Sequence, residues 1–222
     1  MLRTLALLVA LALPGAAIAC PAQPLPEAAR QLLPADGSQD VALFGAAVVH
    51  HVNVARCGAG LAPLAPLPGL NAEATRHSRE MAELGFFDHV SPVPGRRTLA
   101  DRLLPTGVAL SRVAENIGQS FMVDYEPGRE YRTVDAARCA FTYDAGAGVT
   151  DSLGALVGRQ AALMPRRTYA TAAGALVAGW MASPAHARNI LDPAFTRHGA
   201  GYAVSERQTL CGRILATQIL IR

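Results

Sequence analysis

The sequence predicts an α+β domain built in α-β-α layers rather than a doubly wound α/β fold. Helical patterns come first along the chain, and the two clearest strand-like runs close it, at residues 199–206 and 213–222. No βα unit is repeated, so the sheet is not expected to be built from parallel crossovers. The chain has 222 residues, 51% of them hydrophobic, which favours a single core over two small ones.

Residues 1–19 are typical of a secretory signal peptide. Arg3 precedes an apolar run from Leu5 to Leu13, and Ala17-Ile18-Ala19 supplies the small residues of a cleavage site. The run is too short to span a bilayer, and no later stretch reaches the roughly 18 to 20 unbroken apolar residues of a membrane helix. We therefore leave residues 1–19 out of the fold and expect a secreted or periplasmic protein with no transmembrane helix.

Cys20 follows the predicted cut directly, where a bacterial lipoprotein carries its lipid-bearing cysteine. Ala17 lies three residues before the cut instead of the usual leucine, so lipid anchoring through Cys20 and a lipid-free chain both stay open. Residues 20–39 are rich in proline and alanine and predict a tether. The globular domain is expected at residues 40–222.

The cysteines form an even set, which is consistent with two disulfides in an oxidising compartment. They are Cys20, Cys57, Cys139 and Cys211. A lipidated Cys20 would leave three, and four cysteines allow three connectivities between which the spacing does not choose. No CxxC pair is present, which argues against a thiolate zinc site.

Charge argues against nucleic acid as a partner. The formal net charge is only +3, and the 20 basic residues, all arginine, are spread along the chain. Arginine forks suit anion recognition, but a GC-rich genome explains the absence of lysine more simply.

The first half of the domain predicts two long helices. Asp40 is placed to cap a helix over residues 41–56, which a glycine ends just after Cys57. Asn71 is expected to start a second helix that ends at Gly85. Residues 86–95 contain two prolines and a terminal glycine and predict a loop.

The second half combines strands with two more helices. Residues 98–107 predict a short helix and residues 114–124 a strand entry, and the irregular stretch of about 125–167 is interpreted as an insertion from the core. Residues 169–181 then form a clear helical pattern. Ser183-Pro184 predicts the restart of a helix, with serine as N-cap and proline as first helical residue.

Two of the six histidines differ from the rest in their surroundings. His50, His51 and His77 lie within predicted helices and are expected at the surface or the edge of the core. His89 and His186 lie in a loop or at a helix start, beside prolines and glycines, where a rigid backbone can direct an imidazole into a cleft.

His186 falls in the first turn of its predicted helix. The helix dipole and the free N–H groups there disfavour a positive charge, so we expect a neutral imidazole, which can bind a metal or accept a proton. Glu115 would be its acidic partner if it faced the same cleft.

Other catalytic patterns are missing from the sequence. It contains no HExxH, GxSxG, P-loop or GxGxxG motif. Ser183 lies near His186, but a serine before a proline at a helix start is more often a cap than a nucleophile.

Four segments of the chain resemble one family, in the family's order. They are AEATRHSREMAELGFFDHVSP, AENIGQ, WMASPAHARNILDPAFTRHGAGYAV and ATQIL, spread over roughly residues 41–221. On these segments the sequence resembles the bacterial branch of the CAP superfamily, which includes sperm-coating-protein-like, cysteine-rich secretory, antigen 5 and pathogenesis-related proteins.

The resemblance implies a three-layer α-β-α sandwich with a central antiparallel sheet and a large cleft. In the family the cleft holds two histidines and two acidic residues, and the histidines can bind a divalent cation, often Zn²⁺. The two histidines fall on His89 and His186, and the first acid falls on Glu115. Ser183 occupies the place of the second acid, and the insertion at 125–167 is a further departure.

Three functional interpretations follow. The first is an extracytoplasmic binding or interaction module whose cleft holds a divalent metal, with a small molecule, a lipid or a cell-envelope component as ligand. The alternative is a metal-dependent hydrolase in which Glu115 acts as general base on metal-bound water. In the third, the cleft residues only hold the loops together through hydrogen bonds.

Overall fold

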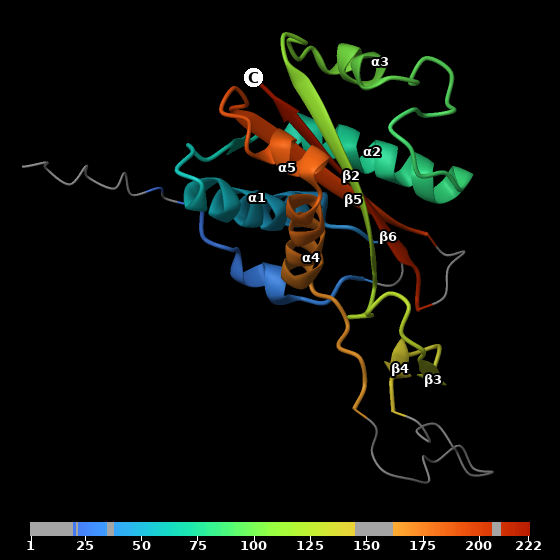
Figure 1. Cartoon of the computed structure of the whole chain (residues 1–222). Coiled ribbons are helices and arrows are strands. Elements are labelled where there is room, and N and C mark those ends of the chain that lie inside the picture. Colours follow the sequence, from blue (N-terminus) through green and yellow to red (C-terminus); the bar gives the residue numbers. More distant parts are fainter. Residues whose placement is uncertain (1–19, 21, 35–37, 145–161, 206–209) are drawn as a thin grey trace, which may run out of the picture.

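The computed structural model describes residues 20, 22–34, 38–144, 162–205 and 210–222 (Figure 1). The predicted signal peptide and the turn expected around Arg207 and Gln208 lie outside these residues. The helices run over Glu27–Arg30 (η1), Val41–Gly58 (α1), Pro68–Leu84 (α2), Leu99–Leu103 (α3), Leu104–Thr106 (η2), Tyr169–Ala182 (α4) and Pro184–Ile190 (α5). The strands are Ala65–Pro66 (β1), Val113–Phe121 (β2), Arg132–Asp135 (β3), Ala140–Thr142 (β4), Arg197–Ser205 (β5) and Arg213–Ile221 (β6).

The central sheet has the strand order β1-β5-β6-β2. The three long strands pair antiparallel, as the family resemblance implies, while the two-residue β1 pairs with β5 in parallel. Side chains alternate between the two faces of a strand, so each face collects one parity of residues. The α+β class and its layered arrangement are confirmed.

One face of the sheet packs against α2 and α3. Gly199 and Gly201 of β5 bring the backbone of α2 unusually close, since a Cβ at Gly201 would lie 2.1 Å from the hydroxyl of Thr75. Asn71 is buried in this contact and accepts a hydrogen bond from the amide of Ala200 at 2.9 Å. The side chain of Asn71, predicted to start α2, therefore bonds to the sheet instead, and the helix begins three residues earlier, at Pro68.

The other face carries the main core beneath α1, α4 and α5 (Figure 1). Phe44, Trp180 and Tyr202 are among its fully buried aromatic side chains. The indole of Trp180 donates a hydrogen bond to the carbonyl of Ile117 on β2 at 2.9 Å. The single tryptophan thus ties α4 to an edge strand of the sheet.

The predicted helix ends are largely confirmed. Asp40 accepts a hydrogen bond from the amide of Leu43 and caps α1. Gly85 ends α2 in the left-handed conformation, with φ at 72°. Ser183 occupies the N-cap position of α5 as predicted, but its side chain makes no capping hydrogen bond.

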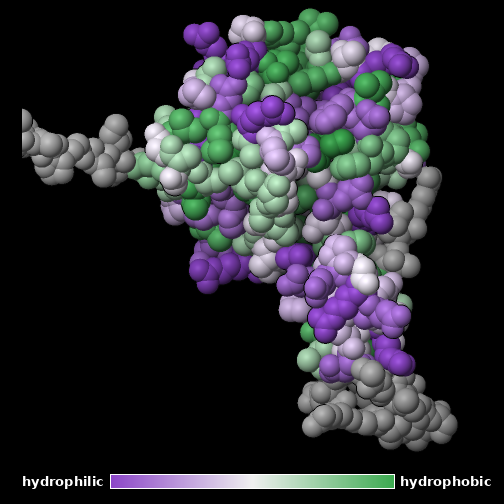
Figure 2. Space-filling view, in the orientation of Figure 1, coloured by the Kyte–Doolittle hydropathy of each residue, from purple (hydrophilic) through white to green (hydrophobic). Residues whose placement is uncertain are grey.

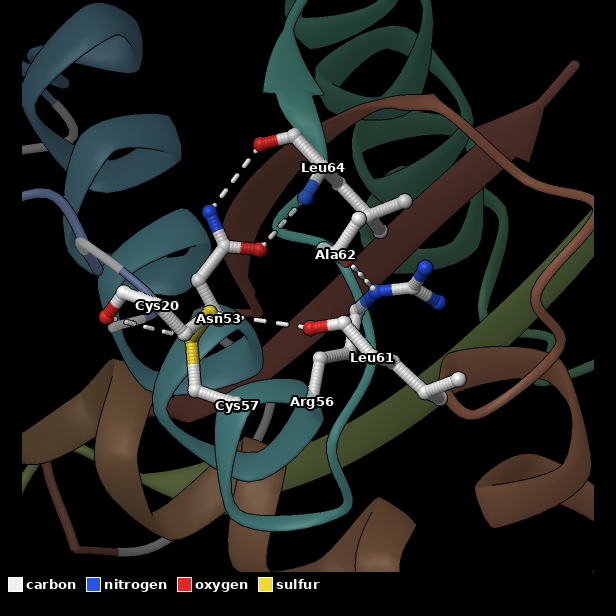
Figure 3. The surroundings of a disulfide bond; sticks show 7 residues. All are labelled: Cys20, Asn53, Arg56, Cys57, Leu61, Ala62 and Leu64. Carbon is white, nitrogen blue, oxygen red and sulfur yellow. Dashed lines mark hydrogen bonds between the residues drawn. A yellow bond between two sulfur atoms is a disulfide. The ribbon is translucent and has the colours of Figure 1, made fainter. Parts of the chain in front are cut away.

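The described part of the N-terminal segment packs onto the domain. Ala29 and Leu33 are fully buried in the main core. Cys20 forms a disulfide with Cys57 near the end of α1 (Figure 3). Of the three connectivities left open by the sequence, the structure therefore has Cys20–Cys57 and Cys139–Cys211.

The predicted insertion contains the small β3–β4 hairpin, which projects below the body in Figure 1. Its visible surface in Figure 2 is mostly hydrophilic. Cys139 on the hairpin is joined to Cys211 at the start of the β6 region, so a covalent bond anchors this projection to the sheet. Residues 145–161 of the insertion lie outside the described residues.

One described helix, α1, is long and apolar enough for a membrane span by length and composition alone. Its side chains are used inside the domain instead. Asn53 accepts a hydrogen bond from the amide of Leu64 and donates one to its carbonyl. The buried guanidinium of Arg56 donates to the carbonyls of Ala62 and Ile190. Figure 3 shows the Asn53 bonds and the bond to Ala62. We therefore interpret α1 as the core helix of the domain.

Candidate metal-binding cleft

His89 and Glu115, which are 26 positions apart in the sequence, meet in the structure. Nδ1 of His89 donates a hydrogen bond to Oε1 of Glu115 at 2.8 Å. His89 lies in the loop after α2 and its side chain is 53% exposed, whereas the carboxylate of Glu115 on β2 is 4% exposed. The pair therefore links a solvent-facing imidazole to a buried charge.

Arg102 of α3 holds the other side of Glu115. Its guanidinium donates to Oε2 at 2.7 Å and to Oε1 at 3.1 Å, and also to the carbonyl of His89 at 3.1 Å. Such a two-pronged contact fits the planar fork of arginine to a carboxylate. Arg102 is fully buried, so one side chain fixes both the acid and the backbone of the histidine.

These contacts set the charge of the pair. Burial alone would raise the pKa of Glu115, but hydrogen bonds from His89 and Arg102 outweigh it and the pKa is lowered. The hydrogen bond to Glu115 raises the pKa of His89 above its usual value despite partial burial. Glu115 is thus an anion at neutral pH, and His89 readily carries a proton.

A second buried ion network holds the loop that carries His89. Arg96, from that loop, donates to Oε1 of Glu73 at 2.8 Å and also binds Glu80, both on α2. The hydroxyl of Ser91 donates to Oε2 of Glu80 at 2.9 Å. The loop is therefore tied to α2 through Ser91 and Arg96 and to α3 through the carbonyl of His89.

His77 lies beneath this loop and is fully buried, so its predicted position at the surface or core edge is wrong. Nε2 donates to the carbonyl of Asp88 at 3.1 Å and lies 4.0 Å from Oε1 of Glu115. Burial lowers the pKa of His77, although Glu115 and Glu80 act in the opposite direction. This neutral imidazole supports the residue directly before His89.

The first turn of α5 brings His186 to the same region. Asn116, next to Glu115 on β2, donates to the carbonyl of His186 at 3.3 Å. Asn189 donates to Oδ1 of Asn116 at 2.8 Å and to the carbonyl of Glu115 at 3.4 Å. Burial and then the charge of His89 lower the pKa of His186, which agrees in direction with the neutral state predicted from its helix position.

The imidazoles of His89 and His186 have the chemistry to hold a divalent cation. Nε2 of His89 is left over once Nδ1 binds Glu115, and a carboxylate commonly orients a metal-binding histidine in this way. His186 favours the neutral form that a metal requires. Within the described ranges, no group of three or more His, Cys, Asp and Glu side chains is placed to hold a metal. Water or a bound ligand would have to complete the coordination.

The sequence predicted His89, Glu115 and His186 as site residues. It gave no indication that Arg102, His77 and Asn189 hold them in place. Arg102 belongs to a short helix with the ordinary pattern of a surface segment, and nothing in its spacing shows that α3 covers β2. The capping box at Thr98 and Asp101 was the one local signal that fixes where this helix starts.

A sequence profile of the CAP family, the cysteine-rich secretory protein family, matches residues 49–218, which is more than half of the chain. The chain belongs to the CAP family. No match was found among curated proteins.

Three solved structures are similar to this chain, and the first of them supports the CAP fold. An extracellular protein with an SCP domain from Bacillus anthracis is 21% identical, with a TM-score of 0.53, over 86% of this chain and 44% of that chain. An outer surface protein from Borrelia burgdorferi gives 12% identity and a TM-score of 0.46, covering 79% of this chain and 90% of that chain. A cysteine-rich secretory protein from Staphylococcus aureus gives 13% and 0.38, covering 79% and 38%. The chain thus spans less than half of the Bacillus protein, and that likeness shows the fold alone.

Proposed function

We propose that this CAP-family protein is an exported binding module whose cleft holds a divalent cation, with Zn²⁺ the first candidate, between His89 and His186. The observation that carries the proposal is the chain of contacts from Arg102 through Glu115 to Nδ1 of His89. It fixes the tautomer and the orientation of the His89 ring before any ligand arrives. The bound cation would supply a Lewis-acidic centre with positions left for a ligand.

The cleft supports binding over hydrolysis. A general base works best when its pKa lies near the working pH. Arg102 and His89 lower the pKa of Glu115, so its carboxylate is a weak proton acceptor, and both of its oxygens are already engaged. Glu115 is better suited to orient His89 than to activate water.

Export is consistent with both the predicted signal peptide and the relatives. The Bacillus protein is described as extracellular and the Borrelia protein as an outer surface protein. The sulfur of Cys20, which a bacterial lipid anchor would use, is bonded to Cys57. The disulfide and the thioether lipid exclude each other at this atom, so we infer a lipid-free Cys20, and an intact mass showing two disulfides and no diacylglycerol would support this.

Calorimetry on the oxidised protein tests the metal site. Zn²⁺ should bind with one-to-one stoichiometry, and His89→Ala and His186→Ala should each abolish binding or weaken it at least about tenfold. His50→Ala is the matched control, because its ring lies on α1, where it binds the carbonyl of Gln23 at 2.7 Å and contacts the neighbouring His51 edge-on. Equal zinc binding in all four proteins would overturn the proposal.

The same titration repeated at lower pH probes the role of Glu115. A cation must displace the proton that the raised pKa of His89 favours, so zinc affinity should fall as the pH drops. The ligand itself remains to be sought among small molecules, lipids and cell-envelope components. Because the cation leaves positions open, zinc-loaded protein is the form to use in such a screen.

A further inference from the structure

A second hollow lies on the α2 face of the sheet, further along β2 from Glu115. Glu115, Ile117 and Gln119 alternate along β2 and face the same side, so Gln119 lies about 13 Å from Glu115 at roughly 3.3 Å per residue. Met81 near the end of α2 packs with Ile117 between the two places. The hollow is therefore separate from the cleft around His89.

The sheet extends past the end of α2 and leaves this hollow behind. The helix stops at Leu84, and Gly85 in the left-handed conformation turns the chain away. β5 and β6 continue beyond this end (Figure 1). Leu215, paired with Gln119, forms a row that packs under Met81 of α2, and Arg213, paired with both Phe121 and Ser205, forms the next row along the sheet.

The pocket that results has a volume of about 150 Å³. This is the volume of about five water molecules at roughly 30 Å³ each. Met81, Phe86, Phe87 and Leu215 make its apolar walls, and Phe87 is 43% exposed. The pocket thus suits a compact apolar group and exposes an aromatic ring at its edge.

Arg213 provides the charge in this pocket. Nη1 donates to Oε1 of Gln119 at 2.7 Å, which fixes the guanidinium from one side, and Phe121 lies with its ring 5.5 Å from the Cζ. Nε is buried without a hydrogen-bond partner. Among the described residues Arg213 forms no ion pair, so one edge of the fork is left for an acceptor.

The chemistry of the missing acceptor follows from charge and shape. A carboxylate matches the fork with two parallel hydrogen bonds and neutralises one positive charge. A phosphate dianion would keep an uncompensated charge beside apolar walls, which is unfavourable. We propose that this pocket, between the end of α2 and the β5–β6 rows, is a binding site for a small carboxylate that carries a compact apolar group.

Hydrocinnamate, a carboxylate with one phenyl ring, is a suitable probe, and its uncharged amide is the matched control ligand. The oxidised full domain is titrated with each compound and followed by ¹H–¹⁵N NMR. Hydrocinnamate should shift the amides of Phe87 and Leu215 in a saturable way, and the amide ligand should not. Arg213→Gln should weaken binding about tenfold or more, as expected for the loss of charge-assisted hydrogen bonds.

Two further variants keep the test specific. Arg138→Gln removes an exposed arginine of the β3–β4 hairpin and should bind hydrocinnamate like the wild type. His89→Ala should also bind it normally, so failure of the zinc site and failure of this site are told apart. Absence of saturable shifts, equal shifts with the amide ligand, or unchanged binding by Arg213→Gln would overturn the proposal. Equal shifts with inorganic phosphate would reject the carboxylate class.

Discussion

Replacing Arg102 with methionine tests whether one buried ion pair holds the cleft together. The guanidinium of Arg102 is fully buried and donates to Glu115 twice and to the carbonyl of His89 once. Its removal leaves the carboxylate of Glu115, 4% exposed, without its main counter-charge. Breaking a buried pair from one side costs about 3–5 kcal/mol, which is a large part of the 5–15 kcal/mol typical of a domain.

Urea denaturation of the oxidised protein at neutral pH measures this loss. Arg102→Met should lower the free energy of unfolding by about 3–5 kcal/mol, and the double variant Arg102→Met with Glu115→Leu should recover most of it, because no unpaired charge is then buried. The control is Arg30→Met, which removes an exposed pair with Glu27 and should change stability by less than about 0.5 kcal/mol. A loss below about 1 kcal/mol for Arg102→Met, or a double variant no better than the single one, would refute the reasoning.

Three further outcomes are expected. Burial, with a contribution from Arg56, lowers the pKa of His198 to about 4. The unfolded chain therefore binds a proton at higher pH than the folded chain, and the free energy of unfolding should fall by about 3 kcal/mol as the pH drops from 6.5 to 4. Urea titrations measure this fall, with His198→Gln as the control. Gly118→Ala should lower stability by about 1–3 kcal/mol in thermal melts, since its Cβ would lie 2.8 Å from the indole nitrogen of Trp180, whereas Gly179→Ala on the open side of α4 should not. Replacing both Cys139 and Cys211 with serine removes the disulfide that closes a 72-residue loop and should lower the free energy of unfolding by about 4 kcal/mol.

Local chemistry made much of the fold predictable. Asp40 and Gly85 mark helix ends through properties of their own, an oxygen that accepts an amide and a backbone free to adopt positive φ. The two strand-like runs at residues 199–206 and 213–222 likewise predicted β5 and β6. The start of α2 was misplaced because Asn71 looks like a cap but bonds the amide of Ala200, a contact set by tertiary packing.

The candidate site was predictable only in part, for a similar reason. His89, Glu115 and His186 could be identified because they lie in segments that resemble a family, and the structure brings His89 and Glu115 into direct contact. Arg102 and His77 became visible only once α3 and α2 were packed over β2. Their residue types and spacing are those of ordinary helical positions, so burial had to be known first.

Anomalous diffraction at the zinc edge, on a crystal of the oxidised protein soaked in zinc chloride, tests the central claim most directly. The account predicts one strong peak at roughly 2.0–2.1 Å from Nε2 of His89 and from a ring nitrogen of His186, with Glu115 still bound to Nδ1 of His89. A peak bound directly by Glu115, a peak elsewhere, or no peak in the cleft would contradict it.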